Sequence, residues 1–252
     1  ANAADMTAAA LAKATGFDVI DVNTAAAGRT VTLADQDITD SDNNQITINA
    51  TGATNAVTVS AAVSAGKTVV LGEALSFTLS NVAGNRVTIA DEADSDADGL
   101  VSDESTETVT TSTTNTGSII TGSASKDTVA IQTSGTKGHN ISLAGADDTI
   151  TLANILATDD TVNGGAGSDT LNVGGNAVSF ATLTNLSNFE VVEVDNQTVT
   201  FTDAGMVGFT DSTVTVNETG ANAAATVSAA VSSGKVVKLG TGGSFTLSDV
   251  AN

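Results

Sequence analysis

Short triplets of the form apolar–Thr–apolar recur along this chain, and their spacing limits the folds that it can adopt. They stand at VTL 31–33, ITI 46–48, VTV 57–59, FTL 77–79, VTI 87–89, VTF 199–201, VTV 214–216 and FTL 245–247. Alternation with a period of two over so few residues indicates half-buried β-strands. A spacing of about ten residues leaves no room for crossover helices between the strands. The chain is therefore predicted to be all-β.

Two all-β architectures satisfy this spacing. The first is a parallel β-solenoid or β-roll in which each coil contributes two short strands, and the alternative is a set of β-sandwich modules flanking a β-roll. The chain lacks Trp, Tyr, Cys and Pro and has only seven Phe, so Val, Ile, Leu, Ala and Thr must form the core. Such residues suit thin, stacked strands, and the absence of proline suits regular strand ladders. One helix is expected, over residues 6–16.

The chain contains a long internal duplication. Residues 51–83 recur as 219–251 with 23 of 33 positions identical, at an offset of 168 residues, and the match extends upstream to residues 16–23 and 188–195. Duplication at this length is typical of a tandem array. We therefore divide the chain into a first repeat at 1–85, an acidic loop and Thr/Ser-rich connector at 86–120, a glycine- and aspartate-rich β-roll segment at 121–178, and a truncated second repeat at 179–252.

The net charge of the chain limits the classes of partner that it can bind. Twenty-nine acidic residues stand against 8 Lys and Arg, which gives a net charge of −21. Nucleic acid and anionic lipid are therefore poor partners, and a cation is the attractive counter-ion. No apolar stretch approaches the roughly 18 residues that a membrane span needs, so no membrane insertion is expected. The absence of cysteine excludes disulfides and thiolate zinc sites.

Residues 164–172, GGAGSDTLN, fit the nonapeptide G-G-x-G-x-D-x-U-x, in which U is a large apolar residue. Gly164, Gly165 and Gly167 allow backbone carbonyls to turn toward a cation, and Asp169 supplies a carboxylate. Leu171 is expected to point into the roll. Hard oxygen ligands select calcium, which is the predicted cofactor. The alternative is that these residues form Asp-rich turns without a ligand.

Neighbouring segments repeat half of this pattern. Asp160-Thr161-Val162 lies nine residues before Asp169-Thr170-Leu171, as a contiguous repeat requires, and Asp148 and Asp127 begin similar triplets at looser spacing. The segments before them, ILATDD at 155–160 and LAGADD at 143–148, lack the paired glycines. We include Asp148 and Asp160 among the candidate ligands and leave the number of ions open.

This segment, with the residues that follow it to Asn196, resembles the RTX family of type I secreted proteins, which includes bacterial surface-layer proteins and giant adhesins. The resemblance is specific over residues 164–172, weaker over 121–195 and compositional elsewhere. It implies a β-roll that folds poorly without calcium, export without a cleaved N-terminal signal, and an extracellular or cell-surface location. It marks Gly164, Gly165, Gly167 and Asp169 as turn and ligand positions, with Asp160 and Asn163 in the adjoining coil.

A second acidic segment, DEADSDADGLVSDE, occupies residues 91–104. Asp94, Asp96 and Asp98 stand at positions one, three and five of a D-x-D-x-D-G loop. The twelfth position of this loop is Ser105, where an EF-hand has Glu. We therefore expect a calcium loop between strands, with a solvated acidic linker as the alternative. The candidate ligands are Asp94, Asp96, Asp98, Leu100, Asp103 and Glu104.

The sequence offers little for catalysis. His139 is the only histidine, its surroundings contain no nucleophile motif, and we expect it on a surface turn. Aromatic platforms for sugars are missing as well. The chain is therefore predicted not to be an enzyme.

The predicted function is structural. We expect a component of an extracellular, calcium-stabilised surface layer, filament or adhesin that self-assembles through repeated β modules, head to tail or in a lattice, with cell-surface polysaccharide as a further candidate partner. Two alternatives stay open. In the first, the chain is the β-roll appendage of a secreted hydrolase. In the second, it is a ligand- or ice-binding adhesin module.

Overall fold

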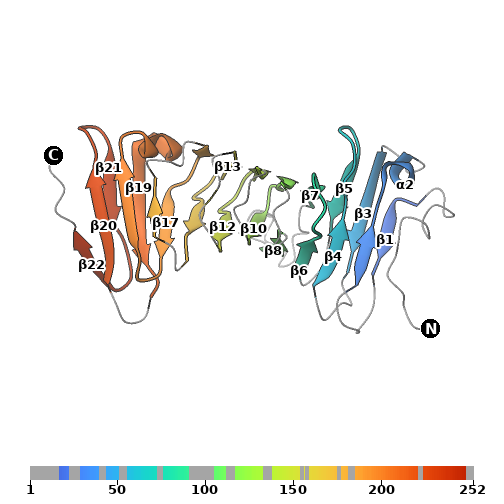
Figure 1. Cartoon of the computed structure of the whole chain (residues 1–252), viewed down its shortest axis with the longest axis horizontal. Coiled ribbons are helices and arrows are strands. Elements are labelled where there is room, and N and C mark those ends of the chain that lie inside the picture. The colour runs from blue at the N-terminus through green and yellow to red at the C-terminus, as the bar shows by residue number, and fades with distance from the viewer. Residues whose placement is uncertain are drawn as a thin grey trace, which may run out of the picture.

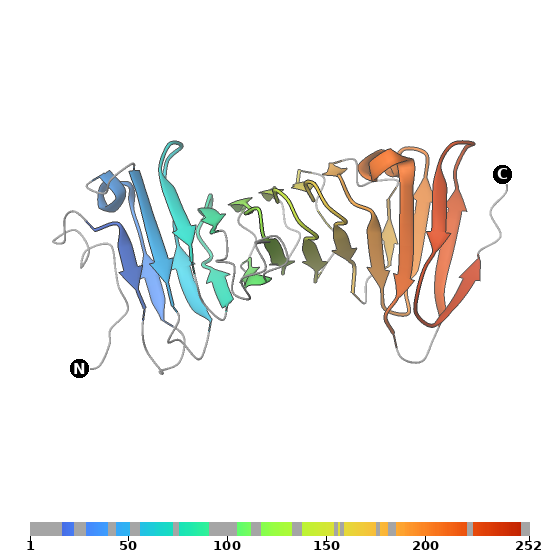
Figure 2. The ribbon, with the colours of Figure 1, turned by 180° about the vertical axis from the view of Figure 1, so that it is seen from behind.

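The chain folds into an elongated parallel β-solenoid, seen here in a computed structural model (Figures 1 and 2). The structure describes residues 17–22, 29–39, 44–50, 56–72, 76–90, 105–111, 117–132, 138–153, 156, 159–174, 177–180, 185–220 and 224–247. Every strand pair within this part is parallel. The predicted solenoid is confirmed, and the antiparallel sandwich alternative is wrong.

Three sheets form the solenoid. The ten-stranded long sheet contains, in order, β2 (Thr30–Thr32), β4 (Val57–Ser60), β6 (Ser76–Leu79), β8 (Ser105–Thr110), β10 (Lys126–Ile131), β12 (Thr149–Leu152), β14 (Thr170–Asn172), β17 (Val191–Val194), β19 (Thr213–Glu218) and β21 (Val236–Leu239). The eight-stranded N-terminal sheet contains β1 (Val19–Asp21), β3 (Gln45–Asn49), β5 (Thr68–Leu71), β7 (Arg86–Ile89), β9 (Ile119–Thr121), β11 (Asn140–Ser142), β13 (Thr161–Asn163) and β16 (Leu186–Ser187). The four-stranded C-terminal sheet contains β15 (Val178–Ser179), β18 (Thr198–Thr202), β20 (Ala224–Ala230) and β22 (Ser244–Leu247).

The chain alternates between sheets as it winds along the long axis. From β1 to β14 it passes back and forth between the N-terminal sheet and the long sheet, and from β17 to β22 between the long sheet and the C-terminal sheet. The long sheet therefore runs through all four sequence segments, and β1 and β22 lie at opposite ends of the molecule (Figure 1).

Inward-facing residues form continuous rows, because parallel strands in register place equivalent side chains one above another. One row of the long sheet consists of Val57, Phe77, Val109, Val129, Ile150, Leu171, Val192, Val216 and Leu239. All except Leu239 are buried. The intervening outward residues are mostly threonine, which explains the apolar–Thr–apolar triplets. Burial of each large aliphatic side chain contributes about 1.5–3 kcal/mol.

The two repeats have matching local structures but use different sheets. Strands β1 to β6 of the first repeat correspond in sequence to β17 to β22 of the second. The strands that the first repeat places in the N-terminal sheet therefore correspond to strands that the second repeat places in the long sheet. A short helix, α2 (Asp35–Thr39), stands where the second repeat has the 3₁₀ helix η3 (Gly205–Gly208). The Ser64 N–H donates to Asp35 Oδ1 at 2.7 Å, and its counterpart Ser232 donates to Asp203 at the same distance.

Three phenylalanines are packed near the start of the C-terminal sheet. Phe180 and Phe201 stack with ring centroids 4.9 Å apart, and Phe209 meets them edge-on at 5.2 and 5.8 Å. A second 3₁₀ helix, η4 (Thr210–Ser212), follows Phe209. The first repeat has Leu33 in place of Phe201. The second repeat therefore fills its interior with larger side chains at the point where one sheet replaces another.

Two sequence predictions fall outside the described residues. These are the helix at residues 6–16 and the acidic loop at 91–104. Within the described part, the structure contains no helix with the length and apolar character that a membrane crossing requires.

Candidate functional site

The glycine-rich nonapeptide forms the third of three stacked turns. Residues 122–127, 143–148 and 164–169 each carry the chain from a strand of the N-terminal sheet to a strand of the long sheet. Successive turns are offset by one coil of 21 residues. The Ala166 N–H donates to the Ala144 carbonyl at 3.1 Å, and Gly145 and Ala166 form an isolated parallel bridge. The turns therefore stack in the same register as the strands.

A ladder of carboxylates runs through these turns. Each acidic side chain accepts a hydrogen bond from the backbone of the acidic residue one coil earlier. Asp127 N donates to Asp148 Oδ1 at 2.8 Å, Asp148 N to Asp169 Oδ1 at 2.9 Å, and Asp169 N to Glu190 Oε2 at 2.7 Å. These residues stand where each chain segment enters the long sheet. The ladder ties four successive coils together through charged acceptors, which form stronger hydrogen bonds than neutral ones.

The first member of the ladder is held within its own turn. Asp127 accepts hydrogen bonds from the Ser123 N–H at 2.7 Å and from the Ser123 hydroxyl at 2.9 Å. Both residues are buried. Ser123 therefore donates a hydrogen bond to each carboxylate oxygen of Asp127.

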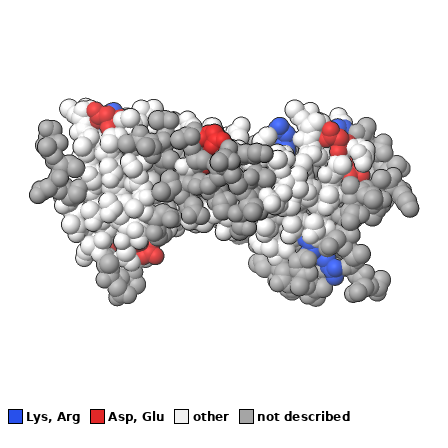
Figure 3. All heavy atoms as spheres, in the orientation of Figure 1, with Lys and Arg blue, Asp and Glu red and all other residues white. Residues whose placement is uncertain are grey.

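Two ladder members carry buried oxygens that have no hydrogen-bond partner. Asp148 and Asp169 are 1% and 0% exposed, and each uses Oδ1 in the ladder while its Oδ2 lacks a partner. On the face drawn in Figure 3, the described Asp and Glu atoms form only a few separate patches. An unpaired buried carboxylate oxygen costs free energy unless a proton or a cation satisfies it.

Burial raises the pKa of both carboxyls. Loss of hydration raises the pKa of Asp148 from 3.8 to about 8, and the negative charges of Asp127, Asp169 and Asp147 add to the shift, while the hydrogen bond from Asp127 N opposes it. Burial, with the charges of Glu190 and Asp147, raises the pKa of Asp169 to about 6 against the opposing hydrogen bond from Asp148 N. Without a cation, Asp148 therefore carries a proton at neutral pH.

The glycines of the nonapeptide permit close contact between coils. Gly165 and Gly167 have φ angles of +115° and +146°, which L-residues rarely adopt. A Cβ on Gly165 would meet the carbonyls of Leu143 and Ala144, and one on Gly167 would meet the carbonyl of Ala146. A Cβ on Gly164 would meet Asp169 Oδ2 at 2.7 Å. The glycines thus bring carbonyl oxygens of the preceding turn, and one free carboxylate oxygen, against the turn of residues 164–169.

The other candidate ligands lie elsewhere. Asp160 stands at the entrance to β13 in the N-terminal sheet, where its Oδ1 accepts the His139 N–H at 2.6 Å. Asn163 ends β13 and accepts a hydrogen bond from Asn188 Nδ2 at 2.8 Å. The structure therefore joins Asp148 to Asp169, which lies in the same turn as the three glycines, while Asp160 joins a different stack. Asp94, Asp96, Asp98, Leu100, Asp103 and Glu104 lie outside the described residues.

His139 belongs to a second buried stack. It is 2% exposed, so the expectation that it lies on a surface turn is wrong. Its Nδ1 accepts the Ser118 N–H at 3.1 Å, and its own N–H donates to Asp160, which gives the order Ser118, His139, Asp160 at one-coil intervals. An imidazole that accepts at Nδ1 carries its proton on Nε2, and that nitrogen is buried without a partner. The residue links coils in the N-terminal sheet.

The sequence contained a signal for the ladder. Asp127, Asp148 and Asp169 each begin an Asp-Thr-apolar triplet, and they are spaced at the 21-residue period of the coil. The nine-residue spacing of the nonapeptide predicts Asp160 as the neighbour of Asp169. It does not predict Asp127 or Glu190 as members of the ladder. Glu190 replaces aspartate in the fourth coil, so the triplet alone does not identify it.

Among the residues that the structure describes, no group of three or more His, Cys, Asp or Glu side chains is arranged to hold a metal ion. A calcium ion at the stacked turns would therefore rely on two carboxylates and on backbone carbonyls. Comparison with protein-family models, with curated proteins and with solved structures finds no match to this chain.

Proposed function

We propose that this chain is a structural segment of an extracellular surface layer, filament or adhesin, whose coils are held together by calcium at the stacked turns and which self-associates through its β modules. The observation that carries the proposal is the buried carboxylate ladder, which places Asp148 Oδ2 and Asp169 Oδ2 in the interior without partners. A rod of stacked coils needs each junction satisfied, and this junction requires a positive charge or a proton.

The elongated fold supports a structural role. One long sheet and continuous apolar rows extend along the axis of the solenoid. Its acidic composition favours cations over nucleic acid or anionic lipid as partners. Repeat architectures of this kind present long surfaces and grow by addition of similar units.

The turn residues fit calcium chemically. The two free carboxylate oxygens belong to Asp148 and Asp169, and the carbonyls of Leu143, Ala144 and Ala146 face the glycines of the next turn. Carboxylate and carbonyl oxygens are the ligands that calcium takes, and it accepts irregular geometry better than magnesium does. Bound calcium would supply the positive charge that offsets repulsion along the ladder. These residues, with Gly164, Gly165 and Gly167 permitting the approach, would hold it.

An extracellular location agrees with such a site. Calcium modules that function outside the cell bind with dissociation constants of about 10⁻⁴ to 10⁻³ M. A site with only two carboxylates falls at this weak end. The ladder would then be protonated or strained at low calcium and satisfied where calcium is abundant.

Calcium titration of the purified chain tests the proposal. Circular dichroism reports the β content and melting temperature, and sedimentation velocity reports assembly, with EGTA and magnesium as references. We expect calcium to raise the melting temperature and to promote association, and magnesium to do so weakly. An unchanged melting temperature and β content in EGTA would contradict the proposal.

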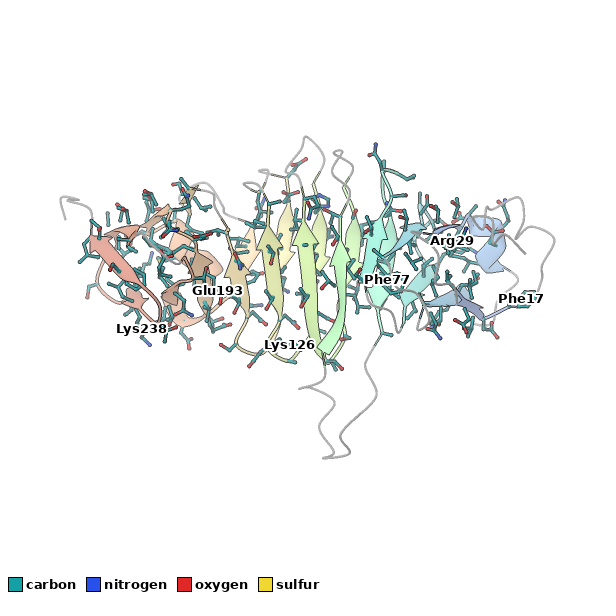
Figure 4. All side chains as sticks on the ribbon, turned by 90° about the horizontal axis from the view of Figure 1, so that it is seen from below. Phe17, Arg29, Phe77, Lys126, Glu193 and Lys238 are labelled. Carbon is teal, nitrogen blue, oxygen red and sulfur yellow. The ribbon has the colours of Figure 1, made fainter. Side chains whose placement is uncertain are left out.

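A second candidate function arises from the outward face of the long sheet. Thr108, Thr128, Thr149 and Thr170 form one row across adjacent strands. A second row, two residues further along each strand, contains Thr78, Thr110, Ala130 and Thr151, so alanine interrupts the threonines at one strand. Parallel strands place such rows about 4.8 Å apart between strands and roughly 6.6 Å apart along them. The side-by-side strands of this face are visible in Figure 4. A regular array of hydroxyls and methyls favours ordered water, as on an ice surface.

Partitioning of the chain into slowly growing ice tests this candidate. Thr149→Lys places a charged side chain in the middle of the array, whereas Thr161→Lys places the same charge on the outer face of the N-terminal sheet. We expect only Thr149→Lys to abolish incorporation into ice. Exclusion of the unchanged chain from ice would eliminate this candidate.

A further inference from the structure

The chain contains one Asn-Gly pair, Asn163-Gly164, where strand β13 meets the glycine-rich turn. In a peptide, the backbone nitrogen that follows an asparagine can attack the side-chain amide carbon and close a five-membered ring. Glycine in the second position favours this reaction, because it has no side chain to hinder the approach and its backbone adopts many conformations. Asn163 is therefore the asparagine of this chain with the greatest intrinsic tendency to lose its side-chain amide.

The reaction replaces the side-chain amide with a carboxylate. The Gly164 nitrogen forms a bond to Cγ of Asn163, the Cγ–Nδ2 bond breaks, and the proton of the Gly164 nitrogen leaves with Nδ2 as ammonia. One water molecule then opens the cyclic imide at either of its two carbonyl carbons. The products are aspartate and isoaspartate, and in isoaspartate the main chain gains one carbon atom. Water is the only co-reactant, and nothing is oxidised or reduced.

The fold holds the Asn163–Gly164 peptide away from the geometry of this attack. The Gly164 N–H donates to the Ser187 carbonyl at 3.0 Å. On the other side of the peptide, the Asn163 carbonyl accepts the Leu143 N–H at 3.0 Å. The side chain is held as well, because its Oδ1 accepts a hydrogen bond from Asn188 Nδ2 at 2.8 Å. Ring closure turns the Gly164 nitrogen toward Cγ and therefore breaks its bond to Ser187.

Two of these three hydrogen bonds come from one short strand and the residue that follows it. Strand β16 (Leu186–Ser187) has two residues, stands last in the N-terminal sheet and pairs with β13 alone among the described strands. Segments with few neighbours open at a lower free energy than central strands do. Detachment of β16 and Asn188 would free both the attacking nitrogen and the side-chain amide, while the long sheet stays folded.

We propose that Asn163 is a deamidation site that β16 protects, and that local detachment of this strand sets the rate of modification in the folded chain. The proposal does not depend on calcium binding. It identifies a slow and irreversible covalent change, and the contact between two strands decides whether the change occurs.

Either product would disturb the turn that follows. Gly164 is buried, and a Cβ at this position would meet Asn188 O and Asp169 Oδ2. The start of the turn thus has no space for the additional main-chain carbon of isoaspartate. The aspartate product adds a negative charge one residue before Gly164. We expect modified chains to stack residues 164–169 poorly on residues 143–148 and to melt at a lower temperature.

Peptide mapping by mass spectrometry tests the site. The full chain is incubated at pH 8 in native buffer with calcium and in denaturing urea, and replacement of NH₂ by OH at residue 163 is followed with time. We expect modification in native buffer to be slower by roughly ten-fold or more, because only the opened fraction reacts. Asn163→Gln, which would have to close a six-membered ring, should resist in both conditions. Equal rates in native buffer and urea would overturn the protection.

A glycine substitution tests the role of the segment that contains β16. Asn188 has a φ angle of +56°, so Asn188→Gly fits the backbone and removes only the Nδ2 donor. Loss of one hydrogen bond should raise the native rate roughly five-fold and leave the rate in urea unchanged. Asn196→Gly is the matched control, since Asn196 has the same φ angle and donates from Nδ2 to Asp195 instead. An unchanged native rate in Asn188→Gly would overturn control by this segment.

Low concentrations of urea separate local detachment from global unfolding in the unchanged chain. Opening of a two-residue strand exposes little surface, so the rate should stay nearly constant below the unfolding transition. Global unfolding exposes much more surface and would make the rate climb steeply with urea. A rate that follows the unfolded fraction would overturn local detachment as the controlling step, whether or not Asn188→Gly folds.

Discussion

The backbone N–H of Asp148 donates a 2.9 Å hydrogen bond to Oδ1 of Asp169, one coil further along the solenoid. The same carboxylate leaves Oδ2 buried without a partner. A single side chain therefore both joins two coils and creates a demand for a proton or a cation. The stability of the rod is tied to its ionic surroundings through this pair.

Without calcium, the free energy of unfolding should fall as the pH rises. The pKa of Asp148 is about 8 in the folded chain and 3.8 is its ordinary value, so above pH 4 the folded state keeps a proton that the unfolded state releases. Stability is therefore fully present below about pH 4 and is lost up to about pH 8. The pKa of Asp169, raised to about 6, adds to the loss over the lower part of this range.

Urea unfolding in EGTA at pH 5 and pH 8 measures this dependence. We expect a lower midpoint at pH 8, and a much smaller difference between pH 6 and pH 8 in Asp148→Asn, which keeps an acceptor oxygen for Asp127 N but does not ionise. Asp211→Asn is the control, since Asp211 is exposed. A midpoint that rises with pH in the unchanged chain would contradict the assignment.

Calcium should stabilise the chain most at the pH where the ladder is least stable. Calcium needs ionised ligands, so its binding competes with protonation of Asp148 and Asp169. At one hundred times its dissociation constant, a ligand adds about 2.7 kcal/mol to the free energy of unfolding. Isothermal titration at pH 8 and pH 6 should show weaker binding at pH 6, with protons released in proportion.

The Asp169→Asn variant tests whether calcium binds at the carboxylate ladder or at other acidic residues of the chain. We expect it to weaken the calcium-dependent rise in melting temperature, whereas Asp211→Asn should leave that rise unchanged. An equal response in both variants would place calcium elsewhere in the chain.

Truncation of a central core residue should destabilise the whole rod. Ile150 is buried in the continuous row between Val129 and Leu171. Ile150→Ala removes packing from both neighbouring coils and should cost about 2–5 kcal/mol. The neighbouring Thr149→Ala, on the outer face, should cost about 0.5 kcal/mol or less. Equal losses in urea unfolding would contradict the assigned inward and outward faces.

Glycine substitutions should distinguish backbone strain from coil contact. Gly167 and Gly66 both have positive φ angles, so alanine at either position is strained by about 1–2 kcal/mol. A Cβ on Gly167 would also meet the Ala146 carbonyl, whereas one on Gly66 would meet no atom within 4 Å. We expect Gly167→Ala to lower the melting temperature more than Gly66→Ala does. An equal fall in melting temperature in the two variants would show that the contact between Gly167 and the preceding turn does not contribute to stability.

The alternating triplets predicted the strands that contain them, but not the strands between β7 and β18. Triplets such as Phe77-Thr78-Leu79 face apolar residues inward in the structure, as their pattern predicts. The absence of proline and the short spacing of the strands left a solenoid and a sandwich open, and the parallel pairing of the strands decided for the solenoid. These inferences succeed because burial on one face of a short strand is a local property of the sequence.

The candidate site was predicted only in part. The pairing of Asp148 with the turn that contains Asp169 depends on a 21-residue coil, and the nonapeptide spacing directed attention to Asp160 instead. His139 was expected on a surface turn, because its surroundings contain no catalytic motif. Its burial follows from contacts with Ser118 and Asp160 in neighbouring coils, which a local pattern does not contain.

The sequence by itself determined the strand positions, the inward apolar rows and the acidic turns, because each depends on residues that are close together in the chain. Only the tertiary structure decided which turns stack, where the long sheet exchanges the N-terminal sheet for the C-terminal sheet, and which carboxylates lose their water. Those outcomes depend on the number of residues in each coil. Coil length sets the register between residues that the chain itself keeps far apart.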